Sequence, residues 1–232
     1  MSTIGGPNIV EDGLILAIDA ANKKSYPGSG TTWTDLSGNG NNGTLYNSPT
    51  FDSNNGGNLA YDGLNTYAKG TEIQPNRFTL STWFKATGVP SNNDSVGATL
   101  FCNNPQYYLN KFQFGINHSW LDQTVTFIVQ NVQATTAGLT ALQNTLYNAV
   151  GTYDGFTLKV YINGVLLKTV ASTTDPVYPN SGDTSFRIGM WGYSSFTRNF
   201  NGNIYQTYLY DRALAADEIL QNYNATKLRF GL

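Results

Sequence analysis

The sequence predicts an all-β protein, an antiparallel sandwich or jelly roll, with one short helix near its C-terminus. Three observations support this fold class: short runs of strand-forming residues, turn-forming Gly, Asn and Asp residues between those runs, and one helical pattern near the end of the chain. Many short strands with a single helix are typical of a sandwich or jelly roll. No repeat and no linker divides the chain, so we expect one domain.

The first part of the chain contains one strand and one long polar segment. Gly13–Asp19 is a run of mostly apolar residues and is predicted to be a buried strand. Asp35–Gly57 is rich in Asn and Gly, which tolerate positive φ angles and therefore favour tight loops. We predict an ordered loop over this segment, anchored by Leu45, Tyr46 and Phe51.

Further strands are expected where bulky and small or polar residues alternate. They are Leu59–Tyr61, Tyr67–Lys69, Phe78–Phe84, Phe112–Ile116, Thr124–Gln130, Phe186–Met190 and Ile204–Leu209. Trp33 and Trp83 are predicted to belong to the core.

The clearest local signal is a three-stranded meander. Leu146–Tyr153, Phe156–Ile162 and Val165–Val170 are strand-like, and the dipeptides Asp154-Gly155 and Asn163-Gly164 separate them. Asp-Gly and Asn-Gly suit two-residue hairpin loops, because the twist of such loops matches the twist of the flanking strands.

One segment, Ala213–Tyr223, has a helical pattern of apolar residues. Ala215 stands where Ser, Thr or Asp would be a better N-cap. Asp217 and Glu218 lie near the start, where acidic side chains stabilise the helix dipole.

Composition excludes several classes of protein. The 232 residues include 13 Lys plus Arg and 15 Asp plus Glu, and charged residues make up 12 % of the chain, against about 25 % in an average soluble chain. Aromatic residues make up 13 %. Disorder and a basic nucleic-acid surface are therefore not expected. Neither is membrane insertion, because no apolar run approaches about 20 residues.

Cysteine, histidine and the N-terminus narrow the expectations further. Cys102 is the single cysteine and His118 the single histidine, so an internal disulfide and a Cys/His zinc site are both excluded. Met1–Pro7 lacks the charged and apolar regions of a signal peptide. We expect synthesis in a cytoplasm, with any exit by a route other than general secretion.

Several segments, in order, resemble the laminin-G-like branch of the concanavalin-A-like jelly rolls. They are Gly13–Leu45, the element Tyr61–Tyr67, the meander Tyr147–Thr169 and Gly202–Leu232. The resemblance implies a jelly-roll domain over residues 13–226, with an N-terminal arm over 1–12 and a C-terminal tail over 227–232. The opening and closing segments are most similar to stand-alone versions in tailed-phage virion proteins.

Some relatives in this group are glycoside hydrolases or lyases, but this sequence lacks their acidic pattern. The glutamates are Glu11, Glu72 and Glu218, and none fits the Glu-x-Asp-x-x-Glu arrangement of the hydrolase relatives. A glycosidase needs two suitably spaced carboxyl groups, which long-range pairing of strands could still supply. His118 has no supporting motif for nucleophilic catalysis. We expect no catalytic residues and no enzyme activity.

Many relatives hold calcium at the rim of the sandwich, and the resemblance places Asp62 and Asn65 at the best-matching positions. Calcium prefers six to eight oxygen ligands. Here Thr66 replaces an acid of the family pattern, and Trp191–Ser195 replaces an acidic loop. We expect no cofactor, with calcium as the open alternative. The other interpretation of Asp62 is a turn residue that bonds its own backbone.

Carbohydrate binding would use aromatic rings at the rim together with amide and hydroxyl groups. The candidate ligand-binding residues are Tyr107, Tyr108, Trp120, Trp191 and Tyr193. A core or protein-interface role remains open for each, because aromatic residues are common in both.

The tail offers apolar side chains for docking, namely Leu228, Phe230 and Leu232. A surface poor in Lys and Glu but rich in Tyr resembles the composition of protein interfaces. The sequence thus predicts a non-enzymatic virion structural protein, such as a capsid decoration protein, whose partners are other virion proteins or like subunits. The alternative is a lectin-like adhesin or tail-fibre module that binds a host-surface glycan.

Overall fold

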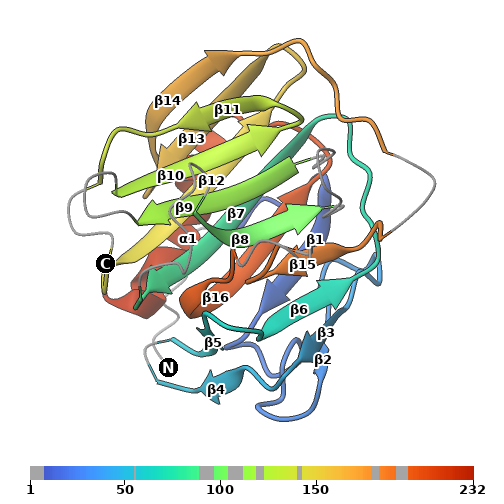
Figure 1. Ribbon diagram of the computed structural model, residues 1–232, viewed down its shortest axis with the longest axis vertical. Helices are drawn as coiled ribbons and strands as arrows, with labels where there is room; N and C mark the ends of the chain where they lie inside the picture. Colours follow the sequence, from blue (N-terminus) through green and yellow to red (C-terminus); the bar gives the residue numbers. More distant parts are fainter. Residues whose placement is uncertain are drawn as a thin grey trace.

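The computed structural model describes residues 8–54, 56–88, 97–103, 112–118, 123–139, 143–178, 183–191 and 198–232. In this part of the chain, two eight-stranded sheets pack face to face, and every strand pairing is antiparallel (Figure 1). This arrangement confirms the predicted sandwich.

The first sheet has the strand order β14-β13-β12-β7-β16-β5-β4, and β1 also pairs with β16. Its strands are β1 (Leu14–Asp19), β4 (Thr50–Asp52), β5 (Asn58–Asp62), β7 (Phe78–Ala86), β12 (Leu146–Tyr153), β13 (Thr157–Ile162), β14 (Val165–Ala171) and β16 (Asn201–Tyr210). The register of β16 shifts between Ile204 and Gln206. β5 pairs with the part of β16 before this shift, and β1 pairs with the part after it.

The second sheet has the order β11-β10-β9-β8-β15-β6-β3-β2. Its strands are β2 (Thr32–Trp33), β3 (Gly43–Tyr46), β6 (Tyr67–Gly70), β8 (Ala98–Asn103), β9 (Phe112–His118), β10 (Gln123–Val129), β11 (Val132–Thr135) and β15 (Phe186–Ile188). Because β3 and β4 lie within Asp35–Gly57, the structure corrects the prediction of a loop over that whole segment. Leu45 anchors it as expected and is only 6 % exposed, whereas Tyr46 is 39 % exposed and does not anchor the segment in the core.

The predicted meander is confirmed as β12, β13 and β14. Asn163 and Gly164 both adopt positive φ angles, 51° and 80°, as a two-residue hairpin turn of this kind requires. At the other turn, the Asp154 carboxylate accepts hydrogen bonds from the backbone N–H groups of Phe156 and Thr157, while Gly155 adopts a φ of 95°.

The core between the sheets is dominated by aromatic rings. Phe78 lies at its centre, with ring centroids 4.3 Å from Phe112, 5.8 Å from Phe127 and 6.0 Å from Tyr153. All four side chains are fully buried. Much of the aromatic excess of the sequence therefore stabilises this interior.

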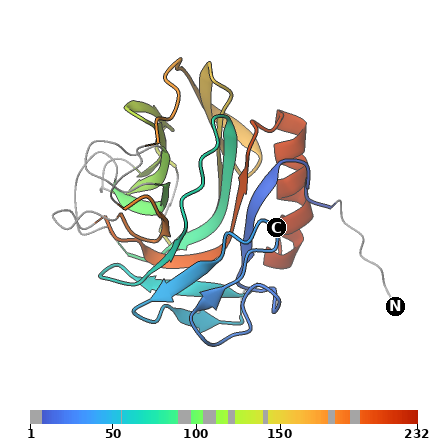
Figure 2. The ribbon, with the colours of Figure 1, turned by 90° about the vertical axis from the view of Figure 1, so that its right-hand side faces the viewer.

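Helix α1 (Ala216–Lys227) covers the outer face of the first sheet, on the side away from the second sheet (Figure 2). A second apolar cluster fills the space beneath it and includes Val150, Tyr161, Tyr208 and Ile219. Ala215 provides no side-chain cap, but the Glu218 carboxylate accepts the Ala215 N–H at 2.8 Å.

The segment expected as a C-terminal tail, residues 227–232, begins in helical structure. α1 continues to Lys227, and a 3₁₀ turn, Leu228–Phe230, follows it. The Phe230 ring packs 4.5 Å from Trp83 and 5.2 Å from Tyr205, measured between ring centroids. This segment is therefore part of the folded domain, although Leu228 and Leu232 are exposed.

The N-terminal arm also contacts the domain where it is described. The Val10 N–H donates to the Asn222 side chain at 2.7 Å, and the Tyr210 hydroxyl donates to the Val10 carbonyl at 3.0 Å. Trp33 and Trp83 are both fully buried, which confirms their assignment to the core. Trp83 lies beneath α1, where its indole N–H donates to the Thr226 hydroxyl.

Candidate functional site

The Asp62–Thr66 turn carries the chain from β5 in the first sheet to β6 in the second. Asp62 Oδ1 accepts hydrogen bonds from the backbone N–H groups of Leu64, Asn65 and Thr66 and from the Thr66 hydroxyl, at 2.8–3.1 Å. Burial alone would raise the pKa of the Asp62 carboxyl, but these hydrogen bonds outweigh burial and lower it. The geometry supports the interpretation of Asp62 as a turn residue.

Two oxygen atoms at the expected calcium position already accept hydrogen bonds. A cation needs free oxygen atoms, whereas four N–H or O–H groups already point at Asp62 Oδ1. The Asn65 carbonyl likewise accepts a hydrogen bond from the Asn47 side chain at 2.7 Å. Among the described residues, no group of three or more His, Cys, Asp or Glu side chains is arranged to hold a metal ion.

Trp191 is the one predicted ligand-binding aromatic within the described residues. It is 3 % exposed, and the Arg198 guanidinium lies 4.3 Å from its ring centroid. The Trp191 ring is therefore buried, and the Arg198 guanidinium lies over its face in a cation–π contact. Tyr107, Tyr108, Trp120 and Tyr193 lie outside the described residues.

Glu218 has a structural partner. Its carboxylate forms a two-point ion pair with Arg212, at 2.6 and 2.8 Å, and these hydrogen bonds lower the pKa of the Glu218 carboxyl. This pairing fixes the start of α1.

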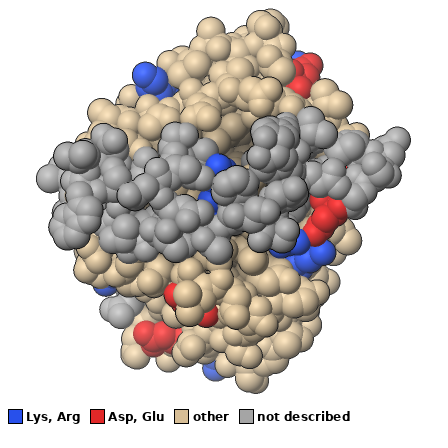
Figure 3. Space-filling model, in the orientation of Figure 1, with Lys and Arg blue, Asp and Glu red and all other residues tan. Residues whose placement is uncertain are grey.

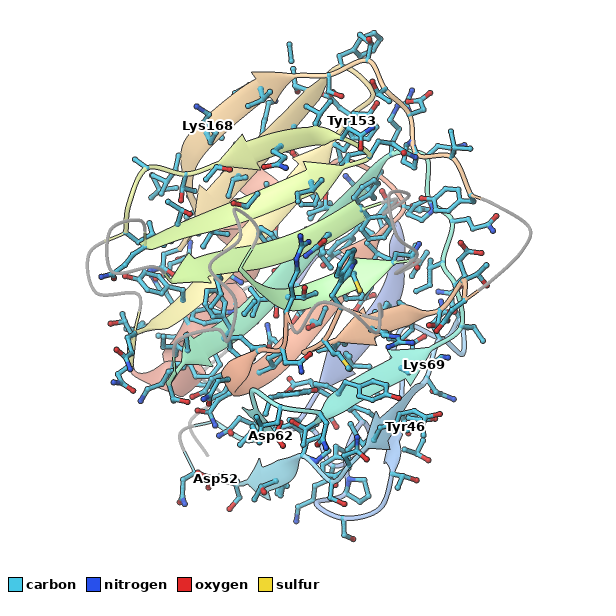
Figure 4. All side chains as sticks on the ribbon, viewed as in Figure 1. Tyr46, Asp52, Asp62, Lys69, Tyr153 and Lys168 are labelled. Carbon is cyan, nitrogen blue, oxygen red and sulfur yellow. The ribbon has the colours of Figure 1, made fainter. Side chains whose placement is uncertain are left out.

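The structure reveals a second group of polar and aromatic residues, which the sequence analysis did not predict as a site. Tyr46, Tyr67, Lys69, Asp183 and Arg187 lie together on the outer face of the second sheet, and we call them the Tyr46 face. Figure 4 shows Tyr46 and Lys69 on the neighbouring strands β3 and β6. Figure 3, in the same orientation, shows blue and red atoms of charged residues next to one another near the right edge, with mostly tan atoms below them.

Strand alternation builds this face. In β6, Tyr67 and Lys69 point outward while Ala68 is fully buried, because successive side chains alternate between the faces of a sheet. In β15, Arg187 lies between the buried Phe186 and Ile188. Register pairs Lys69 with Thr44 on one side and with Arg187 on the other, so the outward residues of three strands form one surface.

The aromatic residues of the face form a stack. The Tyr46 and Tyr67 rings are nearly parallel, with centroids 4.7 Å apart and an interplanar angle of 4°. The Arg187 guanidinium lies 5.3 Å from the Tyr67 ring centroid. Stacking and cation–π attraction thus hold Tyr67 between two neighbours, while Tyr46 remains 39 % exposed.

Asp183 connects the cations of the face. Its Oδ2 lies 2.5 Å from Arg187 Nη2 and 3.2 Å from Lys69 Nζ, and its Oδ1 accepts hydrogen bonds from the Ser185 hydroxyl and N–H. Burial opposes ionisation of Asp183, but the hydrogen bonds from Ser185 and Arg187 outweigh it and hold the pKa of the carboxyl well below its usual range.

Two surface hollows meet at Tyr46. The first, of about 760 Å³, is lined by residues that include Thr44, Tyr46, Lys69, Glu72, Asp183 and Ser185. The second, of about 530 Å³, is lined by residues that include Tyr26, Thr31, Tyr46, Asn47, Ser48 and Phe51. Both hollows are open to solvent, and the first is a shallow depression of the surface.

Residues 56–220 match the family model of the concanavalin A-like lectin/glucanases superfamily, Laminin_G_3. The chain belongs to this family. A comparison with curated proteins gave no match, and no helix within the described residues is long and apolar enough to cross a membrane.

Solved structures with the same fold are distant in sequence. Domain 4 of AbnA, an extracellular arabinanase from Geobacillus stearothermophilus, was solved in complex with arabinotriose. It matches this chain with a TM-score of 0.68 and 16 % sequence identity, and the match covers 92 % of this chain and 100 % of that domain. The sialidase of Trypanosoma rangeli has a TM-score of 0.66 and 15 % identity, covering 95 % of this chain and 35 % of that one. The binding domain of Paraclostridial Mosquitocidal Protein 1 has a TM-score of 0.68 and 14 % identity, covering 93 % and 52 %.

Proposed function

We propose that this chain is a non-enzymatic carbohydrate-binding module whose ligand contacts the Tyr46 face. The observation that carries this proposal is a half-exposed aromatic ring beside anchored charged groups. The C–H face of a sugar can pack on Tyr46, while Lys69 and the exposed Thr44 hydroxyl offer polar groups for its hydroxyl groups. The arabinotriose complex of a structurally similar domain supports the ligand class.

A glycan array followed by titration of the strongest hit tests this function. We expect Tyr46→Ala to weaken binding about tenfold or more, because it removes the stacking surface. Phe156→Ala is the matched control, since Phe156 is an aromatic residue that is 71 % exposed elsewhere on the surface. Unchanged affinity in Tyr46→Ala, or no array binding by the wild-type protein, would contradict the proposal. Incubation with each hit should release no product, in line with a non-enzymatic role.

We propose, as a second candidate, that the chain is an accessory protein of a tailed-phage virion, such as a capsid decoration protein or a tail-fibre module. The resemblance of its opening and closing segments to virion proteins suggests this role. One structural observation favours a protein partner: Val165, Leu166 and Leu167 on the edge strand β14 are 60 %, 46 % and 44 % exposed. Exposed apolar edge strands readily pair with other chains.

Co-sedimentation with empty capsids tests this second candidate. We expect Leu166→Lys to abolish co-sedimentation if β14 docks, and Leu228→Lys or Leu232→Lys to do so if the exposed C-terminal side chains dock. Deletion of Lys227–Leu232 is not a clean test, because Phe230 packs on Trp83. Tyr46→Ala is the control and should sediment as the wild type does. A wild-type protein that remains in the supernatant contradicts a capsid role.

A further inference from the structure

Tyr46 forms a wall shared by both hollows. It is followed in the chain by Asn47 and Ser48, which line the second hollow, while Thr44, two residues earlier on the same face of β3, lines the first. A ligand that packs on the exposed Tyr46 ring is therefore next to both spaces. A ligand longer than one sugar unit can extend into each of them.

This wall is held in place before any ligand binds. Tyr46 stacks on Tyr67, which lies against Arg187. On the other side, Asn47 and Ser48 both adopt a φ of 57°, and the Asn47 side chain donates to the Asn65 carbonyl at 2.7 Å. A preorganised surface loses little conformational entropy on binding, so contacts made there contribute more fully to affinity.

The charges around the two hollows favour a neutral ligand. In the first hollow, Lys69 is already paired with Asp183, and Glu72 adds a second carboxylate. An acidic ligand would meet both carboxylates, so these charges disfavour it. The described residues that line the second hollow include no Lys, Arg, Asp or Glu. A neutral polyhydroxylated ligand can donate to the carboxylates and accept from Lys69 without an unpaired charge.

We propose that the ligand of the Tyr46 face is a neutral carbohydrate chain that crosses Tyr46 and places sugar units in both hollows. This inference rests on the proposed carbohydrate-binding function and specifies its substrate class. It predicts that the site binds consecutive sugar units of a neutral chain, and not a single terminal sugar or an acidic glycan.

Calorimetric titration with chains of defined length tests the inference. The probes are arabino-, cello- and malto-oligosaccharides of one to six units, the same length series of the strongest array hit, and oligogalacturonides as acidic counterparts. We expect affinity to rise about tenfold or more from the single sugar to a chain that fills both hollows, and then to level off. Neutral chains should bind more tightly than acidic chains of equal length.

Variants that fill one hollow at a time localise the effect. Thr44→Trp narrows the first hollow, and Thr31→Trp narrows the second; both threonines are exposed, so the new ring need not enter the core. In each variant, affinity should no longer rise with the length of the chain. A short ligand should still bind in the hollow that the new Trp does not fill. Thr169→Trp, on the exposed strand β14, is the matched control and should bind as the wild type does.

The outcomes separate this inference from the function on which it rests. Equal affinity for the single sugar and the long chains would overturn the chain-binding inference but leave carbohydrate binding intact. Tighter binding of the oligogalacturonides would overturn the neutral class. Absence of binding to every oligosaccharide and to the array would contradict the proposed function itself.

Discussion

Asp183 is the residue that organises the charges of the Tyr46 face. Its carboxylate is within 3.2 Å of Lys69 and 2.5 Å of Arg187, and Arg187 in turn lies against Tyr67. If the Asp183 carboxylate loses its charge, Lys69 and Arg187 remain near each other without the anion that both contact. The position of the aromatic stack therefore depends on the ionisation of a residue that lies outside the strands.

This dependence predicts a pH effect on stability. Because the pKa of Asp183 is lower in the folded protein than in the unfolded chain, its stabilising contribution is complete above about pH 4 and is lost as the pH falls through the folded value. We expect Asp183→Asn to lower the Tm at about pH 7, and the difference from the wild type to shrink below about pH 4. Thermal melts across this range measure it. Glu11→Gln, at an exposed position, is the control. If the Tm difference between Asp183→Asn and the wild type stayed constant with pH, the proposed role of the Asp183 charge would be wrong.

The hairpin between β13 and β14 has a glycine with a positive φ in its turn. Gly164 adopts a φ of 80°, and a Cβ there would lie 3.1 Å from Leu220 of α1. We expect Gly164→Ala to reduce the free energy of unfolding by about 1–2 kcal/mol, because an L-residue is strained in this region. Denaturant unfolding measures the change. Gly138→Ala is the control, since the φ of Gly138 is not positive and its Cβ would meet open space; equal effects at the two positions would contradict the turn assignment.

Helix α1 and the 3₁₀ turn after it form the element that covers Trp83. Because the Phe230 ring is half-buried against Trp83 and Tyr205, we expect Phe230→Ala to reduce the free energy of unfolding by roughly 1–3 kcal/mol. Leu232→Ala, at a 51 % exposed side chain, should change it by less than about 0.5 kcal/mol. Equal stability of the two variants would show that the C-terminal segment does not stabilise the domain.

Local signals determined which elements could be predicted from the sequence. The meander was predictable because Asp154-Gly155 and Asn163-Gly164 specify their own turns. The strands within Asp35–Gly57 were not, because their pairing with β5 and β6 outweighs a composition typical of loops. The helix extends to Lys227 because residues such as Thr226 contact Trp83, a partner that is distant in the sequence.

The Tyr46 face was hidden from sequence reasoning for a related reason. Alternation in Tyr67-Ala68-Lys69 and Phe186-Arg187-Ile188 indicates that Tyr67, Lys69 and Arg187 point outward. Nothing local indicates that β15 pairs with β6, or that Asp183 reaches both cations. By contrast, the turn role of Asp62 was available from the Asp-Gly dipeptide alone.

On the scale of the whole molecule, the two candidate surfaces lie far apart. β14 is at one end of the sandwich, and β3 and β6 are at the other (Figure 1). α1 covers the outer side of the first sheet, whereas the Tyr46 face belongs to the second sheet. A partner on β14 would therefore leave the Tyr46 face accessible, so attachment to a protein and binding of a glycan are compatible in one chain.

The whole domain is also expected to be stable without calcium. The Asp62 turn is closed by its own N–H groups, and a bound ion that stabilised the fold would lower the Tm when it was removed. We expect excess EDTA to leave the Tm unchanged and added calcium to have no effect. A large fall in Tm with EDTA that calcium reverses would contradict this expectation.

Carbohydrate binding at the Tyr46 face can be observed residue by residue, by amide chemical-shift mapping during titration with the strongest array hit. We expect the largest shifts at Tyr46 and its neighbours Thr44, Asn47 and Lys69, on both sides of the shared wall. Largest shifts on another surface, with the signals of Tyr46 and its neighbours unchanged, would contradict binding at this face.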